Sequence, residues 1–207
     1  CLKQLNYPDG LFSATKVWTS STADGRRQVE QSKELWGVST LDLEQVHNLV
    51  NWRDHLKTLR GLKEGGTIRY TGVTTSHGRR HGELARILRS EPLDFVQLTY
   101  NLANRETEDL IALARDKGIA VIANRPYGGG RLIDRMQREI LPRWAGEVHC
   151  LNWPEFLLKY IVAHPGITCA IPATSKVEHM RENMGACHGQ LPDEAGRRRM
   201  LAYARNL

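Results

Sequence analysis

The stretch Leu41-Asp-Leu-Glu-Gln-Val-His47 is typical of a short strand that ends on a histidine. Similar apolar or alternating segments recur along the chain, and helix-like sequence separates each from the next. A parallel neighbour is reached only through a crossover, so strands that alternate with helices predict a parallel sheet. The predicted strands lie at residues 11–18, 41–47, 67–74, 94–100, 119–123 and 168–171.

The segments between and after these strands carry apolar residues at helical spacing. The predicted helices lie at residues 26–36, 52–63, 83–89, 107–117, 132–140, 154–163, 176–186 and 192–206. Such alternation fits an open doubly wound sheet, and it fits equally a parallel barrel that lacks its first two units. No linker or shift in composition divides the chain, so we expect a single domain over residues 1–207.

Composition excludes several classes of function. The net charge of +6 permits an anionic ligand, but the basic residues are not interleaved with aromatics, so no nucleic-acid partner is predicted. No apolar run approaches the roughly 20 residues that span a bilayer, so no membrane partner is predicted. The four cysteines form no CxxC pair, which favours reduced thiols over disulfides or a metal site, and we expect a cytoplasmic protein.

Two polar residues stand at the carboxyl ends of adjacent predicted strands. Lys16 lies near the end of the strand over residues 11–18, and His47 ends the next strand. In a closed parallel barrel such positions face the reaction chamber. By itself, a lysine in an apolar strand is more often one that extends its ammonium to solvent, and a lone histidine is more often structural. The pair is therefore a candidate catalytic site that needs further support.

That support comes from six motifs in a fixed order. They are Ala14-Thr-Lys16, Asp42-Leu43 with His47, the segment at residues 65–73, Val96-Gln-Leu-Thr-Tyr-Asn101, Arg125-Pro-Tyr-Gly128, and Ile171-Pro-Ala-Thr-Ser175 with Glu182-Asn183. In this order and spacing the chain resembles the aldo-keto reductases over residues 11–186. The resemblance implies an α/β fold of the (β/α)8 TIM barrel type, with the first two βα units absent from this chain.

The resemblance also implies reduction of a small-molecule aldehyde or ketone with NADP(H) as cofactor, NAD being possible. Lys16 matches the family's lysine, whose charge lowers the pKa of a tyrosine acid, and His47 matches the histidine that orients the carbonyl. The matching cofactor contacts are Thr74, Thr75, Gln97, Asn124, Arg125, Pro126, Gly128, Thr174, Ser175, Lys176, His179, Glu182 and Asn183. Of these, Asn124 replaces a stacking aromatic, and His179 replaces the arginine that many members pair with the 2′-phosphate.

The chain departs from the family pattern before its first strand, because the family's aspartate and tyrosine have no match here. We expect the natural protein to begin upstream of Cys1, and we expect residues 1–207 alone to reduce carbonyl compounds poorly. The alternative is a nucleotide-binding barrel that serves as a regulatory or scaffold subunit. The sequence leaves the physiological substrate and the oligomeric state open.

Overall fold

The computed structural model describes Gln4, Asn6 and residues 10–205 of the chain. The chain forms two compact units. The first comprises Cys1–Gln97 with Lys117–Ile119, and the second comprises Leu98–Asp116 with Ala120–Leu207.

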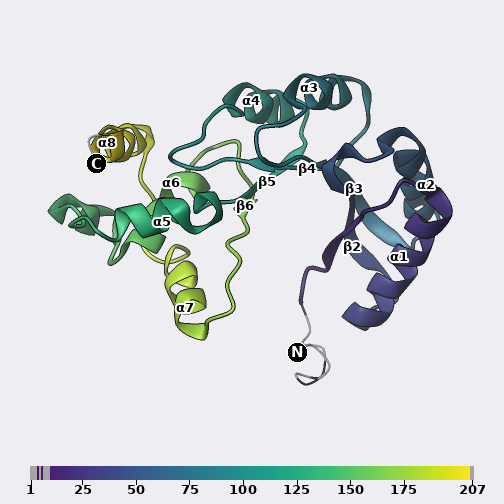
Figure 1. Ribbon diagram of the computed structural model, residues 1–207, viewed down its shortest axis with the longest axis horizontal. Coiled ribbons are helices and arrows are strands. Elements are labelled where there is room, and N and C mark those ends of the chain that lie inside the picture. Colours follow the sequence, from purple (N-terminus) through teal and green to yellow (C-terminus); the bar gives the residue numbers. More distant parts are fainter. Residues whose placement is uncertain (1–3, 5, 7–9, 206–207) are drawn as a thin grey trace. The chain divides into compact units, whose positions relative to one another are not determined.

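The described part of the chain contains one six-stranded sheet whose strands follow chain order, which confirms the predicted strand set (Figure 1). The pairings of β1 with β2, β2 with β3, β3 with β4 and β5 with β6 are parallel, as expected. The strands are β1 (Ala14–Val17), β2 (Leu41–Val46), β3 (Ile68–Thr74), β4 (Phe95–Thr99), β5 (Ala120–Asn124) and β6 (Cys169–Ala170). The α-helices are α1 (Thr22–Trp36), α2 (Trp52–Glu64), α3 (His81–Ser90), α4 (Glu108–Asp116), α5 (Arg131–Met136), α6 (Trp153–Val162), α7 (Val177–Gly185) and α8 (Glu194–Arg205). Short 3₁₀ turns are η2 (His47–Leu49), η3 (Gly128–Gly130) and η4 (Arg143–Val148).

In the first unit, α1 and α2 pack against each other and against the first three strands (Figure 1). Register places Lys16 beside Gln45, and Gln45 beside Gly72, so these three residues share one face of the sheet. A Cβ at Gly72 would lie 2.6 Å from the Phe95 carbonyl oxygen. Glycine at this position therefore lets the neighbouring strand and the Gln45 side chain approach closely.

The second unit is built around α6, which contacts α5, α7 and β6 (Figure 1). Every residue from Trp153 to Ile161 is buried, including Glu155 and Lys159. A helix that is apolar nearly all round is one that its neighbours enclose, and α6 has that position here. Asn152 caps its start, since the Asn152 side chain accepts a hydrogen bond from the Glu155 N–H.

Two predicted helix boundaries and one predicted buried helix face were wrong. Helix α1 begins at Thr22 rather than at residue 26, because Ser21 caps it and Gly25 packs directly on the His55 ring. Helix α5 ends at Met136, four residues early. Met180 and Met184, whose i, i+4 spacing predicts core positions, are 43% and 51% exposed, because α7 buries Asn183 instead.

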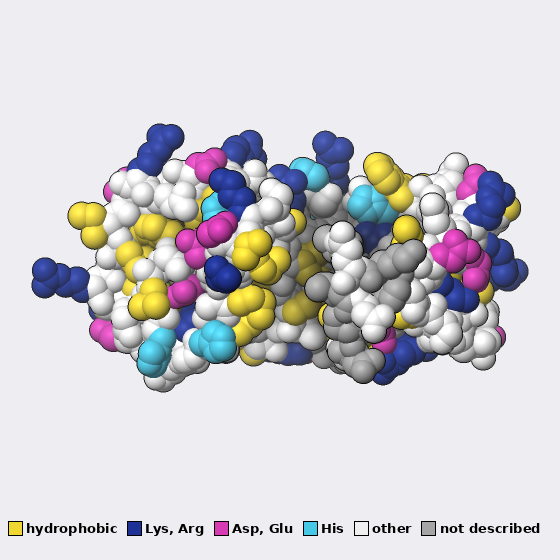
Figure 2. Space-filling model, turned by 90° about the horizontal axis from the view of Figure 1, so that it is seen from below, with side chains coloured by type: hydrophobic (Ala, Val, Ile, Leu, Met, Phe, Trp, Pro, Cys, Tyr) yellow, Lys and Arg dark blue, Asp and Glu magenta, His cyan; other side chains and the backbone are white. Residues whose placement is uncertain are grey.

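The surface carries no continuous basic band on the face that Figure 2 shows. There, Lys and Arg side chains lie singly or in small groups among acidic and apolar ones. No helix within the described residues is both long enough and apolar enough to cross a membrane.

Candidate functional site

The two predicted catalytic residues lie at the carboxyl ends of paired strands in the first unit. Lys16 is in β1, and His47 follows the last residue of β2. Burial lowers the pKa of Lys16, and the Glu44 carboxyl opposes that shift. Burial also lowers the pKa of His47, and the positive charge of Lys16 lowers it further. The two groups therefore interact electrostatically, and the neutral imidazole is favoured near neutral pH.

Glu44 is a third ionisable group of this cluster, and the sequence prediction missed it. Its side chain is 1% exposed, and its Oε2 has no hydrogen-bond partner among the described residues. Burial raises its pKa to about 8, against the opposing influence of Lys16. Glu44 thus holds its proton at neutral pH. The available signal was an acidic residue inside an otherwise buried strand, next to a candidate active-site residue.

The loop after His47 has an unusual backbone. Asn48, Leu49 and Asn51 all have positive φ angles, of 50°, 56° and 43°. Such a backbone costs free energy in residues other than glycine and persists only where neighbours hold it. The Asn48 N–H donates to Thr74 Oγ1 at 3.0 Å, and Arg80 donates to the Asn48 and Leu49 carbonyl oxygens. These bonds hold the backbone of the two residues that follow His47.

The strand ends beside this loop carry three predicted cofactor contacts. Thr74 pairs with Gln97 across β3 and β4, and the Thr75 N–H donates to the Gln97 carbonyl oxygen. All three side chains are buried. The Thr74 hydroxyl, predicted to contact a cofactor, is thus already an acceptor for the Asn48 N–H. A hydroxyl can still donate one hydrogen bond while it accepts another.

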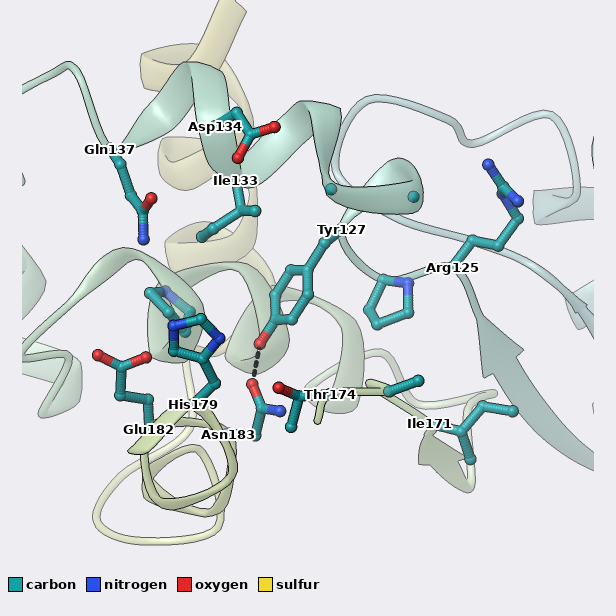
Figure 3. A pocket seen from close by; sticks show the side chains of 15 residues that line it. Arg125, Tyr127, Ile133, Asp134, Gln137, Ile171, Thr174, His179, Glu182 and Asn183 are labelled. Atoms are coloured by element: carbon teal, nitrogen blue, oxygen red, sulfur yellow. Dashed lines mark hydrogen bonds between the residues drawn. The ribbon is translucent and has the colours of Figure 1, made fainter. Parts of the chain in front are cut away.

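The second unit contains a pocket of about 440 Å³ (Figure 3). Its walls come from the loop after β5, helix α5, the segment after β6, and helix α7. The residues that line it are Arg125, Pro126, Tyr127, Gly129, Gly130, Ile133, Asp134, Gln137, Pro154, Ile171, Ala173, Thr174, His179, Glu182 and Asn183. A concave, largely apolar site with a few polar groups is typical of a small-molecule or cofactor site.

Six of the predicted cofactor contacts line this pocket: Arg125, Pro126, Thr174, His179, Glu182 and Asn183. Gly128 lies directly before the lining glycines. Ser175 and Lys176 are exposed and are not among the residues that line it. Asn124 is buried, and its Oδ1 accepts a hydrogen bond from Thr99 Oγ1 at 2.7 Å. The sequence prediction therefore found much of the pocket, but it missed the α5 wall and Tyr127.

The segment Gly128–Gly130 has a backbone in the left-handed region of φ at every residue. Gly128, Gly129 and Gly130 have φ angles of 60°, 74° and 95°. A Cβ on Gly129 would lie 2.7 Å from the Arg125 guanidinium, so a side chain there would displace Arg125. The Gly128 and Gly130 N–H groups donate to the Arg125 and Tyr127 carbonyl oxygens, at 2.9 and 3.0 Å, and these bonds close the turn. The guanidinium of Arg125 beside this turn suits an anionic ligand such as a phosphate.

Asn183 provides the most specific sign of a ligand. Its Oδ1 accepts a hydrogen bond from the Tyr127 hydroxyl, as Figure 3 shows. Its Nδ2 is buried and has no partner among the described residues. Buried donors are rarely left unpaired, so an unpaired amide in a pocket wall indicates a group that binds there. Burial and the charge of Glu182 raise the pKa of Tyr127, which keeps its hydroxyl protonated as the donor.

The chain is similar in sequence to known oxidoreductases. An uncharacterised oxidoreductase of Schizosaccharomyces pombe is 28% identical over 214 residues, which cover 93% of this chain and 66% of that protein. One of Bacillus subtilis is 22% identical over 199 residues, which cover 84% of this chain and 63% of that protein. The chain thus spans slightly less than two thirds of these relatives.

Solved structures show the same fold. An aldo/keto reductase from Klebsiella pneumoniae, in complex with NADP and acetate, has a TM-score of 0.78 at 21% identity, over 98% of this chain and 72% of that one. The holo form of a Bacillus halodurans aldo-keto reductase has a TM-score of 0.73 at 21% identity, over 92% and 70%. The fold is that of the (β/α)8 barrels. The model of the Aldo/keto reductase family matches residues 1–198, and the chain therefore belongs to that family.

Proposed function

We propose that the protein is an oxidoreductase that transfers a hydride from NADPH, or from NADH, to a small aldehyde or ketone. The observation that carries the cofactor assignment is the unpaired, buried Nδ2 of Asn183 in the wall of a 440 Å³ pocket. The neighbouring Arg125 suits phosphate groups. These residues fit a dinucleotide, which is what the Klebsiella pneumoniae structure contains in its complex.

Each part of the pocket has a chemical role in this proposal. Arg125 holds phosphate oxygens, and the absence of a side chain at Gly129 leaves room for its guanidinium. Asn183 and Glu182 hold the adenine, and Thr174 and His179 lie by the adenosine phosphate. In the first unit, Thr74, Thr75 and Gln97 match the family's carboxamide contacts. In the second unit, Asn124 stands in place of the aromatic that stacks on the nicotinamide ring. When bound, the cofactor supplies the hydride, which no protein side chain can supply.

Lys16, Glu44 and His47 at the strand ends stabilise the charge that develops during carbonyl reduction. His47 is predominantly neutral and donates a hydrogen bond to the substrate carbonyl oxygen, on which negative charge develops. The Lys16 ammonium stabilises that charge and the conjugate base of the acid that protonates the oxygen. Glu44, protonated at neutral pH, leaves the positive charge of Lys16 uncompensated. The strained loop at Asn48 and Leu49 holds the imidazole in place, so little reorganisation is needed during the reaction.

The test is a spectrophotometric assay of the purified protein, with any residues that precede Cys1 in the natural protein included. NADPH and a reactive aromatic aldehyde are mixed, and cofactor oxidation is followed. We expect aldehyde-dependent oxidation that Lys16→Met and His47→Ala both abolish, while the matched exposed variant Lys57→Met retains it. Cofactor binding without turnover would refute the enzymatic role and support the regulatory or scaffold subunit instead.

A further inference from the structure

The ammonium of Lys159 is held inside the second unit by backbone carbonyl groups. Lys159 is 0% exposed. Its Nζ donates to the carbonyl oxygens of Val148 and His188, each at 2.6 Å. Longer contacts reach the carbonyl oxygens of Gln190 at 3.3 Å and His149 at 3.5 Å. No carboxylate pairs with this ammonium among the described ion pairs.

The four carbonyls come from two segments that are far apart in the sequence. Val148 and His149 belong to the turn before α6, whereas His188 and Gln190 follow α7. Lys159 itself is on α6. One ammonium, with three N–H donors, therefore ties the chain that leaves α7 to α6 and to the turn before it. A charged donor makes stronger hydrogen bonds than a neutral one.

Two further contacts join the same segments. The His149 ring packs against Gly189, where a Cβ would lie 2.6 Å from His149 Cγ, and His149 Nδ1 accepts a hydrogen bond from the Gln190 N–H. Gly189 has a φ of 72°, which other residues adopt rarely. These contacts enclose the Lys159 ammonium on the α7 side.

Helix α7 carries His179, Glu182 and Asn183, which form one wall of the pocket (Figure 3). Apart from Asn183, most of the α7 side chains are exposed, so apolar packing contributes little to holding this helix. The Asn183 side chain accepts a hydrogen bond from the Tyr127 hydroxyl, which joins α7 to the loop after β5. The bonds of Lys159 to His188 and Gln190 therefore constrain the chain that leaves the helix, in addition to the packing of Gly185 against Glu155.

We propose that Lys159 is a positioning residue for cofactor binding, which holds α7 in the orientation that presents its side chains to the adenosine phosphate portion of the cofactor. This inference rests on the proposed function. Lys159 touches no ligand itself. Without it, α7 samples other positions, and the apparent dissociation constant rises in proportion to the fall in the population of the competent state.

The test uses 2′,5′-ADP as a probe of the adenosine phosphate site, together with hydrogen exchange of the free protein. For Lys159→Met, we expect affinity for 2′,5′-ADP to fall roughly tenfold. A fall of this size results if α7 has the binding-competent orientation in about one molecule in ten. Exchange should accelerate over residues 177–190 and stay unchanged in α4. Lys159→Arg, which keeps a charged donor, should recover much of both properties.

Arg197→Met is the matched control, because Arg197 is a basic residue of α8 that also bonds a backbone carbonyl oxygen of the second unit. Arg197 Nε donates to the Tyr160 carbonyl oxygen, and its guanidinium also donates to the Tyr100 hydroxyl, so its loss should loosen α8 and leave α7 unchanged. If Lys159→Met does not fold, the same two measurements are made on Gly189→Ala, which is then the deciding variant. The new Cβ pushes the 188–190 segment away from the Lys159 ammonium.

Unchanged exchange over residues 177–190 in the deciding variant would overturn the proposal, as would unchanged affinity for 2′,5′-ADP. Failure of the parent protein to bind 2′,5′-ADP would refute the proposed function instead. The exchange measurement on the free protein separates these two failures, since it needs no ligand.

Discussion

Replacing Glu44 by glutamine is expected to make the stability of the protein less dependent on pH. The carboxyl is buried, and its pKa rises from an ordinary 4.5 to about 8 in the folded state. Below pH 4.5 it is protonated in both states, so its ionisation costs no stability. As the pH rises toward 8, the unfolded state releases the proton and the folded state retains it, which stabilises the unfolded state.

The size of the effect follows from those two pKa values. Between pH 5 and pH 7.5 the parent should lose about 3 kcal/mol of unfolding free energy relative to Glu44→Gln. Above pH 8 the difference should level off, since both states are then ionised. Glutamine has nearly the same shape as glutamate and cannot ionise. The contributions of all other titrating groups to the unfolding free energy therefore cancel in the comparison.

The assay is urea denaturation of both proteins at several values between pH 5 and pH 8.5, under one ionic strength. The quantity compared is the difference between their unfolding free energies at each pH. A difference that stays constant within about 1 kcal/mol across this range would refute the reasoning, because it would mean that Glu44 ionises with an ordinary pKa in the folded protein.

Three other substitutions test different parts of the account. Lys16→Met should raise the pKa of His47, measured by NMR titration, yet leave it below its ordinary value because burial is the larger cause; a pKa that does not move would exclude the electrostatic link. His179→Arg should increase the preference for NADPH over NADH by roughly tenfold in fluorescence titrations, since arginine adds a charged, bidentate partner for a phosphate; an unchanged ratio would place the 2′-phosphate elsewhere. Gly185→Ala should lower the unfolding free energy by about 1–3 kcal/mol in urea, because its Cβ would lie 2.3 Å from Glu155 Oε1; a variant as stable as the parent would show that Glu155 shifts without cost.

Local pattern was sufficient to predict the strands and the positions of Lys16 and His47. The helical spacing along α2 arises from burial of one face, which a sequence records directly. The start of α1 was missed because Gly25 normally weakens a helix. Here the His55 ring of α2 packs where a side chain would be, and that contact depends on the tertiary fold.

The candidate site shows the same limit. Motif order identified six residues of the pocket. Tyr127 stands inside one of the motifs but was assigned no role there, and the α5 wall comes from a segment outside the motifs. The i, i+4 methionines of α7 predicted a core face, but the helix buries Asn183 and sets Gly185 against Glu155. The acceptors of Lys159 are backbone carbonyls, which no residue type reveals. Glu44 was detectable as an acidic residue in a buried strand, but its raised pKa depends on the packing around it.

The most direct test of the central claim is a calorimetric titration of NADPH into the protein and into Asn183→Leu, with the exposed variant Glu194→Gln as the control. We expect the parent and Glu194→Gln to bind NADPH equally well. Asn183→Leu should bind roughly tenfold more weakly, because it lacks the buried donor that has no partner among the residues the structure describes. Absence of NADPH binding by the parent, or equal binding by all three proteins, would contradict the assignment of this pocket to the cofactor.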